Sequence, residues 1–348
     1  MISTRELARI ANVSQSTVSR SLRDSPEISV ETKTRIWNIA KQHGYITREN
    51  PSKTVMSGQR KAIGVLITFL PFLNDICMNQ LLSTLYSSIE EENYYAIPLI
   101  NYSGEEGVQK LRNFIRLGLV EGFIIINRTY DPAIDAYLNG VGMPVVYLIY
   151  YSRDAAEHTV IVDADNYMGG HIAAQHLISL GHRDFIVITS QWDEFKDRTR
   201  GFLSGLSDNG LSIPPENIFC EDCFYDVGYR LISENLHLFQ KATAIYVQAD
   251  IVAFGVVNAL KDHGISVPDE VSVIGTDGLE LGALCRPQLT SIASPFRDMA
   301  NITIGKLMEV SNNPGKETIT TRTILPPSLL VRESTAPPPR RTGGGEIG

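Results

Sequence analysis

The sequence predicts an α/β protein with a small helical head followed by a much longer domain of two doubly wound parallel sheets. Residues 1–45 contain three short segments with apolar residues at helical spacing and no strand pattern. After residue 61, short apolar runs alternate with longer segments at helical spacing, as in parallel strands covered by helices on both faces. This second part, residues 62–335, is too long for one ordinary sheet, which indicates two lobes.

The first helix of the head is predicted to begin near Thr4. Ser3 and Glu6 form an S-x-x-E capping box, in which each side chain satisfies a free amide of the first turn. One face then carries apolar residues at helical spacing: Leu7, Ala8, Ile10 and Ala11. Asn12 follows where the chain must turn sharply, and Asn tolerates a positive φ angle well.

Ser14 is expected to cap a second helix. Its apolar residues Val18 and Leu22 are four apart and point back at the first helix. Its outward face carries short or forked polar side chains: Gln15, Ser16, Thr17, Ser19 and Arg20. In helix-turn-helix docking, the N-terminal end of such a helix enters the major groove. There Arg can hold guanine O6 and N7 together, and Gln suits adenine N6 and N7.

A third helix is predicted to start at Ser29 and to end at Gly44. Its apolar residues face inward: Ile36, Ile39 and Ala40. A small three-helix adaptor domain would show the same spacing. The charge distribution favours DNA binding instead, because residues 1–61 carry a net charge of +6 whereas the rest of the chain carries −14. Phosphate-seeking charge is therefore concentrated in the head.

Residues 46–61 are polar and contain Pro51 and Gly58, which by composition predicts a flexible tether between the two parts. The large domain beyond it has eight candidate strands, at 62–69, 94–101, 122–126, 144–149, 159–163, 185–190, 243–248 and 271–275. Ligands of doubly wound sheets bind beyond the carboxyl ends of the strands. With two lobes, we expect that site to be a cleft between them.

Several motifs, taken in order, resemble the LacI/GalR family of bacterial transcriptional regulators. The head contributes VSQSTVSRSL (13–22) and Gly44-Tyr45. The large domain contributes VDADNYMGGHIAAQHLISLGHRDFIVI (162–188), RTRGF (198–202), GISVPDEVSVIGTDG (264–278), PQLTSI (287–292) and LPPSLLVREST (325–335). The match runs from about Ser3 to Thr335. It implies a two-lobed fold like that of periplasmic sugar-binding proteins, with an N-lobe at about 62–161 plus 293–324 and a C-lobe at about 162–292 plus 325–335.

The resemblance implies that the second helix reads an operator. By position, Gln15, Ser16 and Arg20 match the base-reading residues of the family. Three neighbours match positions nearer the phosphates, which fix register: Ser14, Thr17 and Ser19. Thr4, at the start of the first helix, is also predicted to contact DNA.

In this family a short hinge helix forms in the tether on operator binding, and a Leu from each subunit wedges into the minor groove. This chain has Ser52, Lys53 and Val55 where the family usually has Ala, Arg and Leu. Val55 is the candidate wedge and Met56 the second candidate, with Lys53 as a DNA contact.

The resemblance also implies an effector site in the cleft. Arg198 matches the family's cleft arginine, whose forked guanidinium suits a hydroxyl pair or a carboxylate. Asp277 matches its late cleft aspartate, and Asp165 an acidic residue at the cleft mouth. Asp250 matches the Asp of an Asn-Asp pair in which the Asn is here Ala249. Four further candidates follow strand ends: Phe72, Asn74 and Asp75 come after the first strand, and Trp192 comes after the sixth. Cys223 falls where the family often has an aromatic ring, and the neighbouring Phe224 could take that role.

A sugar or sugar derivative is the expected effector, although Ala249, Cys223 and Thr276 depart from the family pattern. Without the family match, each of these residues would have an ordinary structural explanation. An acidic residue at a strand end is commonly a helix cap, and a single Arg is commonly part of a surface ion pair.

An enzyme and a solute-binding protein without a regulatory role are the alternatives. We predict no catalytic residue and no cofactor, because the sequence has no G-x-S-x-G, no P-loop and no G-x-G-x-x-G after the first strand. Cys220 and Cys223 form C-x-x-C, but no second pair is spaced to complete a zinc site, so no metal is expected. The basic helical head argues against a pure solute-binding protein.

The expected partners are double-stranded operator DNA, a small-molecule effector and a second copy of the chain. Two-fold operators require two reading heads, so we expect a homodimer with contacts near the helix at 75–92. No export signal or apolar run near twenty residues is recognisable, which predicts a reduced cytoplasmic protein without membrane contact. The tail APPPRRTGGGEIG (336–348) is rich in Pro and Gly and is predicted to be disordered.

Overall fold

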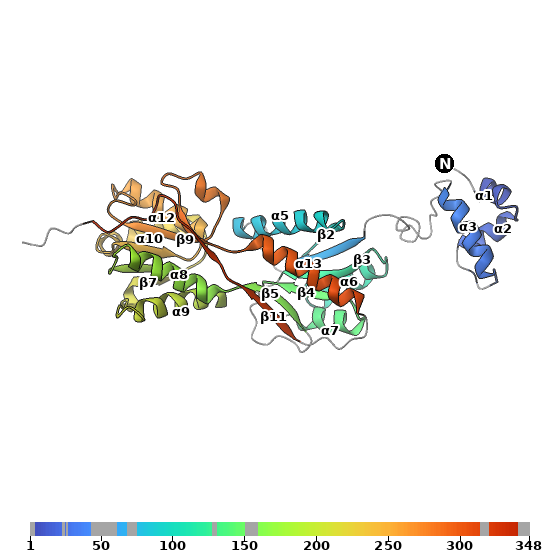
Figure 1. The fold of residues 1–348 in the computed structure, drawn as a ribbon, viewed down its shortest axis with the longest axis horizontal. Helices are drawn as coiled ribbons and strands as arrows, with labels where there is room; N and C mark the ends of the chain where they lie inside the picture. Colours follow the sequence, from blue (N-terminus) through green and yellow to red (C-terminus); the bar gives the residue numbers. More distant parts are fainter. Residues whose placement is uncertain are drawn as a thin grey trace, which may run out of the picture.

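The structure of this chain is a computed structural model that describes residues 4–22, 25, 27–42, 61–67, 75–126, 131–149, 159–313 and 320–339. Within these ranges it contains a three-helix head and two lobes, each with a six-stranded sheet and helices on both faces (Figure 1). The predicted fold class is confirmed. None of the helices in these ranges is both long and apolar enough to cross a membrane.

The head consists of α1 (Thr4–Ile10), α2 (Gln15–Leu22) and α3 (Val30–Gln42). Its buried core joins all three helices: Leu7, Ala8, Ala11, Val18, Leu22, Ile36 and Ala40. Asn12 turns the chain between α1 and α2 with a φ of 52°, as its position predicts. The prediction that Ile10 faces inward is wrong, since Ile10 is 40% exposed. It lies at the edge of the apolar stripe that the buried residues of α1 form.

The N-lobe sheet has the strand order β11-β5-β4-β3-β1-β2, with parallel neighbours throughout. Its strands are β1 (Ala62–Ile67), β2 (Tyr95–Ile100), β3 (Val120–Ile126), β4 (Val145–Leu148), β5 (Val160–Ala164) and β11 (Thr321–Leu325). One face packs against α5 (Ile76–Glu91) and α13 (Phe296–Asn312), and the other against α6 (Gly104–Ile115) and α7 (Pro132–Gly140). The five strands predicted in this lobe are confirmed, whereas β11 was not predicted.

The C-lobe sheet has the order β12-β10-β9-β8-β6-β7, parallel except for β12. Its strands are β6 (Phe185–Thr189), β7 (Ile218–Cys220), β8 (Ala244–Val247), β9 (Ser272–Asp277), β10 (Thr290–Ala293) and β12 (Ser328–Leu330). One face packs against α8 (Asn166–Ser179) and α9 (Asp193–Ser207), and the other against α10 (Tyr225–Glu234) and α12 (Asp250–Asp262). Three short helices complete the lobe: α11 (Leu236–Phe239), η2 (Pro215–Asn217) and η3 (Glu280–Ala283).

In the described residues the chain passes between the lobes after β5, after β10 and after β11. The first passage was expected at about 161–162, but those residues lie inside β5. Residues 336–339, expected to belong to a disordered tail, are described as part of the C-lobe. The Ala336 carbonyl accepts a hydrogen bond from Ser272 Oγ at 3.0 Å and lies 2.9 Å from His182 Nε2. These contacts hold the chain against β9 beyond the predicted boundary.

Two glycines allow α8 and α9 to lie side by side in unusually close contact (Figure 1). A Cβ atom at Gly170 would stand 1.9 Å from the carbonyl oxygen of Arg198, and one at Gly201 would stand 1.9 Å from that of Tyr167. A larger side chain at either position would therefore force the two helices apart. This packing fixes the backbone of Arg198 against α8, whose first residue is Asn166.

Candidate functional site

The α2 helix of the head presents a polar face to solvent. Ser14 Oγ accepts a hydrogen bond from the Thr17 amide at 3.0 Å, which caps the helix as predicted. Val18 and Leu22 are buried in the core of the head. The opposite side therefore exposes three of the polar residues predicted to contact DNA: Gln15, Ser16 and Arg20.

All three exposed side chains have partners within the head, and Ser16 Oγ lies 2.7 Å from Ser14 Oγ. Gln15 Nε2 donates to Thr4 Oγ1 at 3.0 Å, so Thr4 lies beside the polar face. Arg20 Nη1 donates to Glu27 Oε2 at 2.7 Å, and the two side chains are 59% and 64% exposed. Exposed ion pairs of this kind contribute about 0–1 kcal/mol, so Arg20 can leave Glu27 for another acceptor at little cost. Thr17 and Ser19 are half-buried at the flank of this face.

Five residues of the predicted sites lie outside the described residues. Three belong to the tether, Lys53, Val55 and Met56, and two follow β1, Phe72 and Asn74. Their roles stay predictions.

A cavity with an empty volume of about 720 Å³, partly open to solvent, lies between the two lobes. Both lobes contribute to it. The N-lobe provides Asp75 and Asp163, and the C-lobe provides Asn166, Glu194, Arg198 and Asp277. Apolar side chains cover part of the wall: Met78, Phe195, Ile251, Phe296 and Met299. Ligand sites have this mixture of apolar walls with a few polar groups.

Arg198 is 8% exposed and is held in one orientation by hydrogen bonds. Its Nε donates to Asn166 Oδ1 at 2.7 Å, and its Nη1 donates to the Gln248 carbonyl oxygen at 2.6 Å. The guanidinium also lies over the Phe195 ring, 4.9 Å from its centroid. Asp277 Oδ1 stands 3.8 Å from Nη1, which is an ion pair without a hydrogen bond.

Asp277 sits at the end of β9 with a φ of 129°, a conformation that L-residues rarely adopt. Its Oδ2 accepts a hydrogen bond from the Asp250 amide at 3.2 Å. The hydrogen bond from the first residue of α12 thus helps to hold the Asp277 side chain in the cavity wall. Burial raises the pKa of this carboxyl although Arg198 opposes the shift.

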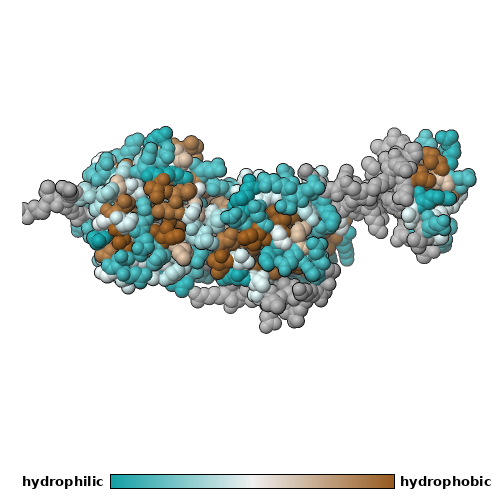
Figure 2. All heavy atoms as spheres, viewed as in Figure 1, coloured by the Kyte–Doolittle hydropathy of each residue, from teal (hydrophilic) through white to brown (hydrophobic). Residues whose placement is uncertain are grey.

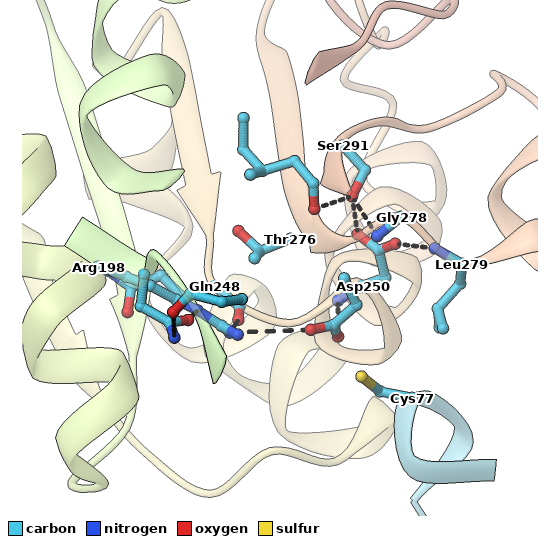
Figure 3. Close-up of polar contacts among 12 residues, drawn as sticks. Cys77, Arg198, Gln248, Asp250, Thr276, Gly278, Leu279 and Ser291 are labelled. Atoms are coloured by element: carbon cyan, nitrogen blue, oxygen red, sulfur yellow. Dashed lines mark hydrogen bonds and ion pairs between the residues drawn. The ribbon is translucent and has the colours of Figure 1, made fainter. Parts of the chain in front are cut away.

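Asp250, predicted to bind the effector, is fully buried behind the cavity wall. Its Oδ2 accepts from the Leu279 amide at 2.8 Å, and its Oδ1 accepts from Ser291 Oγ at 2.7 Å (Figure 3). Burial raises the pKa of Asp250, and the Leu279 hydrogen bond opposes that shift. Asp250 therefore positions the loop that follows Asp277 and does not line the cavity.

The other predicted effector residues divide between the cavity and its surroundings. Asp75, Arg198, Cys223 and Asp277 line it. Asp165 instead caps α8 by accepting from the Met168 amide at 2.8 Å. Trp192 is the N-cap residue of α9 and packs against the C-lobe core, and Phe224 is 59% exposed outside the cavity.

Sequence reasoning missed several polar residues of the cavity. Asp163 is 4% exposed, and burial raises its pKa to about 7. Glu194 is buried in the first turn of α9. Cys77 points from α5 toward the carboxylates of the C-lobe (Figure 3), and burial, followed by Asp277 and Asp75, raises the pKa of its thiol. The D-x-D-N sequence at 163–166 contained the signal for Asp163. Asp165 caps α8, so Asp163 is the acidic residue near the strand end that is left to face the cleft.

Comparisons with known proteins agree with this two-part architecture. Residues 4–48 match the family model for bacterial regulatory proteins of the lacI family, and residues 174–335 match a periplasmic binding protein-like domain. The HTH-type transcriptional regulator RegA of Clostridium saccharobutylicum is 28% identical over 341 residues, which cover 96% of this chain and 99% of that protein. The HTH-type transcriptional repressor PurR of Actinobacillus pleuropneumoniae serotype 3 (strain JL03) is 28% identical, covering 84% of this chain and 86% of that protein.

A solved structure supports the same assignment. The crystal structure of a LacI family transcriptional regulator from Enterococcus faecium with bound ribose superposes with a TM-score of 0.66 at 27% identity. The match covers 80% of this chain and 99% of that one. A DNA-binding head that matches the lacI family of bacterial regulatory proteins is thus followed here by a periplasmic-binding-protein-like domain, and the relatives of the chain over its length are transcriptional regulators.

Proposed function

We propose that this chain is a ligand-responsive, sequence-specific DNA-binding regulator that represses carbohydrate-related genes. The observation that carries the proposal is the interlobe cavity, lined from both sides by charged residues, in a chain that also exposes the polar face of α2. The named relatives are transcriptional regulators, and one of them is a repressor. In this proposal the cavity binds its ligand without chemical conversion.

The DNA-reading part of the proposal rests on α2. Gln15, Ser16 and Arg20 would face base edges, and Ser14, Thr17 and Ser19 would lie nearer the phosphates. The exposed Arg20 can exchange Glu27 for guanine without leaving an unpaired buried group. Thr4 would reach the same surface through its contact with Gln15.

The ligand-sensing part rests on the opposition of the two lobes. Asp75 enters the cavity from the N-lobe, whereas Arg198 and Asp277 enter it from the C-lobe. A ligand that contacts both groups binds a closed arrangement more tightly than an open one and therefore shifts the population toward it. Coupling between such a site and a DNA site is typically about 1–3 kcal/mol and is reciprocal. The ribose in the Enterococcus faecium regulator supports a sugar or sugar derivative as the ligand.

We also propose a homodimer, because a two-fold operator requires two reading heads. The C-lobe exposes Leu281 of η3 at 42% and Leu284, directly after η3, at 75%. Apolar side chains gather in patches on both lobes in the view of Figure 2. The Glu280 amide donates to Gln80 Oε1 of α5 at 3.1 Å, so the region around η3 adjoins the helix expected to form the dimer contact.

The experiment that tests this proposal is selection of bound duplexes from a random-sequence library, followed by affinity measurements with variants at Arg20. Arg20→Ala should weaken binding and lose discrimination at one base pair, and the binding that remains should be salt-sensitive. Arg20→Lys is the matched control, because it keeps the positive charge but loses the forked guanidinium. We expect it to keep the phosphate attraction and to lose discrimination at one base pair. Unchanged preference in both variants would reject the assigned role.

A further inference from the structure

We propose that the ligand of the interlobe cavity is a polyhydroxyl compound that carries a protonated amine, such as an amino sugar, and that Asp163 selects the amine. This inference rests on the proposed ligand-sensing role of the cavity and names the charge class of its ligand. The expectation of a sugar derivative leaves neutral, anionic and cationic compounds open. The charged side chains that line the cavity distinguish between these three classes of ligand.

Carboxyl groups outnumber cations in the cavity wall. Asp75, Asp163, Glu194 and Asp277 line it, and among the described residues of that wall Arg198 is the one cationic side chain. A further carboxyl group, that of Asp250, stands directly behind Asp277. Burial raises the pKa of Asp163 and of Asp277, and a positively charged occupant would favour the ionised form of both carboxyls, so this wall suits a cation.

The single guanidinium offers little to an anionic ligand. Arg198 already directs Nε to Asn166 and Nη1 to the Gln248 carbonyl oxygen, and Asp277 stands 3.8 Å from it. A phosphate or carboxylate that approached Arg198 would also have to enter the field of the surrounding carboxyl groups. Sugar phosphates and uronic acids are therefore disfavoured.

Asp163 has the chemistry to hold the amine. It is the last residue but one of β5, before the passage between the lobes, it is 4% exposed, and its Oδ1 accepts from the Ala164 amide at 2.8 Å. Burial raises its pKa to about 7 although the Ala164 amide, Arg322 and Arg198 favour the ionised form, so a further cation would stabilise the carboxylate. An ammonium group would supply that stabilisation. Phe195 and Phe296 offer apolar faces for the carbon skeleton of the ligand.

The test is calorimetric titration of the full chain with sugars that differ in one substituent. Glucosamine, galactosamine and mannosamine are each compared with the neutral hexose and with its 6-phosphate and uronic acid, at about pH 7, where an ordinary amine is protonated and Asp163 is about half ionised. We expect at least one amino sugar to bind on the order of ten-fold or more tighter than its neutral partner, with the two anions weaker still. Failure of every amino sugar to bind, or preference for a neutral or anionic partner, overturns the proposal.

A pair of variants assigns the preference to Asp163. Asp163→Asn should reduce the ratio of amine to neutral affinity toward one and leave binding of the neutral sugar in place. Asp193→Asn, which removes the same charge from an exposed residue of α9 paired with Lys196, should leave the ratio unchanged. An equal loss in both variants, or none in Asp163→Asn, contradicts the role of Asp163.

The outcome also separates this inference from the proposed function. If a neutral or anionic sugar binds and changes DNA affinity, the charge class is wrong and the regulatory function stands. If an amino sugar binds with the expected preference but leaves DNA affinity unchanged, the charge class stands and the regulatory function fails.

Discussion

Replacing Asp163 by Asn should change how the stability of the ligand-free protein depends on pH. Burial raises the pKa of Asp163 to about 7, and the nearby Glu194 carboxyl adds to the shift, while the Ala164 amide, Arg322 and Arg198 oppose it. In the unfolded chain an Asp has a pKa of about 3.9. Between about pH 4 and pH 7, Asp163 is therefore protonated in the folded protein and ionised in the unfolded chain.

The sign of the effect follows from proton linkage. Because the folded state binds more protons, the contribution of Asp163 to stability is present below about pH 4 and is lost as pH rises to about 7. A shift of about three units corresponds to about 4 kcal/mol, which is an upper limit for this loss. Asn keeps the shape of the side chain and cannot ionise. The Asn variant should therefore gain stability over the wild type as pH rises from 4 to 8, by up to about 4 kcal/mol.

Urea unfolding followed by circular dichroism, at several pH values across this window, measures the difference. Asp193→Asn serves as the control, since Asp193 lies on the surface of the C-lobe, where its side chain is 50% exposed. Its profile should run parallel to that of the wild type. A parallel profile for Asp163→Asn as well would refute the reasoning, because it would mean that Asp163 keeps an ordinary pKa in the folded protein.

Three further predictions concern the head, the helix packing and the loop after Asp277. Glu27→Gln should raise affinity for duplex DNA by no more than about five-fold, since the exposed pair with Arg20 contributes at most about 1 kcal/mol; weaker binding in fluorescence anisotropy would contradict this. Gly201→Ala should lower the free energy of unfolding by about 1–3 kcal/mol or more, because its Cβ would meet the Tyr167 carbonyl oxygen. Gly140→Ala is the control and should not destabilise, since its Cβ would meet nothing within 4 Å. Equal melting temperatures for the two variants would show that α8 and α9 can separate freely. Ser291→Ala removes a donor to Asp250 Oδ1 and should lower the free energy of unfolding by about 1–3 kcal/mol, measured by denaturant titration. Ligand binding should also weaken, because the loop after Asp277 loses support. An unchanged unfolding midpoint would mean that Asp250 needs no such partner.

The sequence predicted most of the architecture because its strands are apolar and its helices separate them. The strands that it did not predict, β7, β10, β11 and β12, have three to five residues and carry polar or exposed side chains. Their pairing is decided by neighbours distant in the chain, such as Leu330 of β12 opposite Ser291 of β10. Local patterns do not contain that information.

The candidate site was predicted in part for a similar reason. Arg198 and Asp277 were found from motifs that place them at a helix face and a strand end. The motif that contains Asp250 gave its position but not its depth, which depends on how closely Gly275 and Ser291 approach it. Asp163 was missed because Asp165, two residues later, offered a more familiar acidic position.

The measurement that tests the account most directly is the affinity of the full chain for a selected duplex, with and without a bound ligand, in the wild type and in Asp277→Asn. Coupling between cavity and head predicts that the ligand changes the DNA affinity of the wild type by roughly five-fold or more. It predicts no change in Asp277→Asn, which should still bind the duplex. An identical ligand response in the two proteins, or no response in a wild type saturated with ligand, would contradict the link between the interlobe cavity and α2.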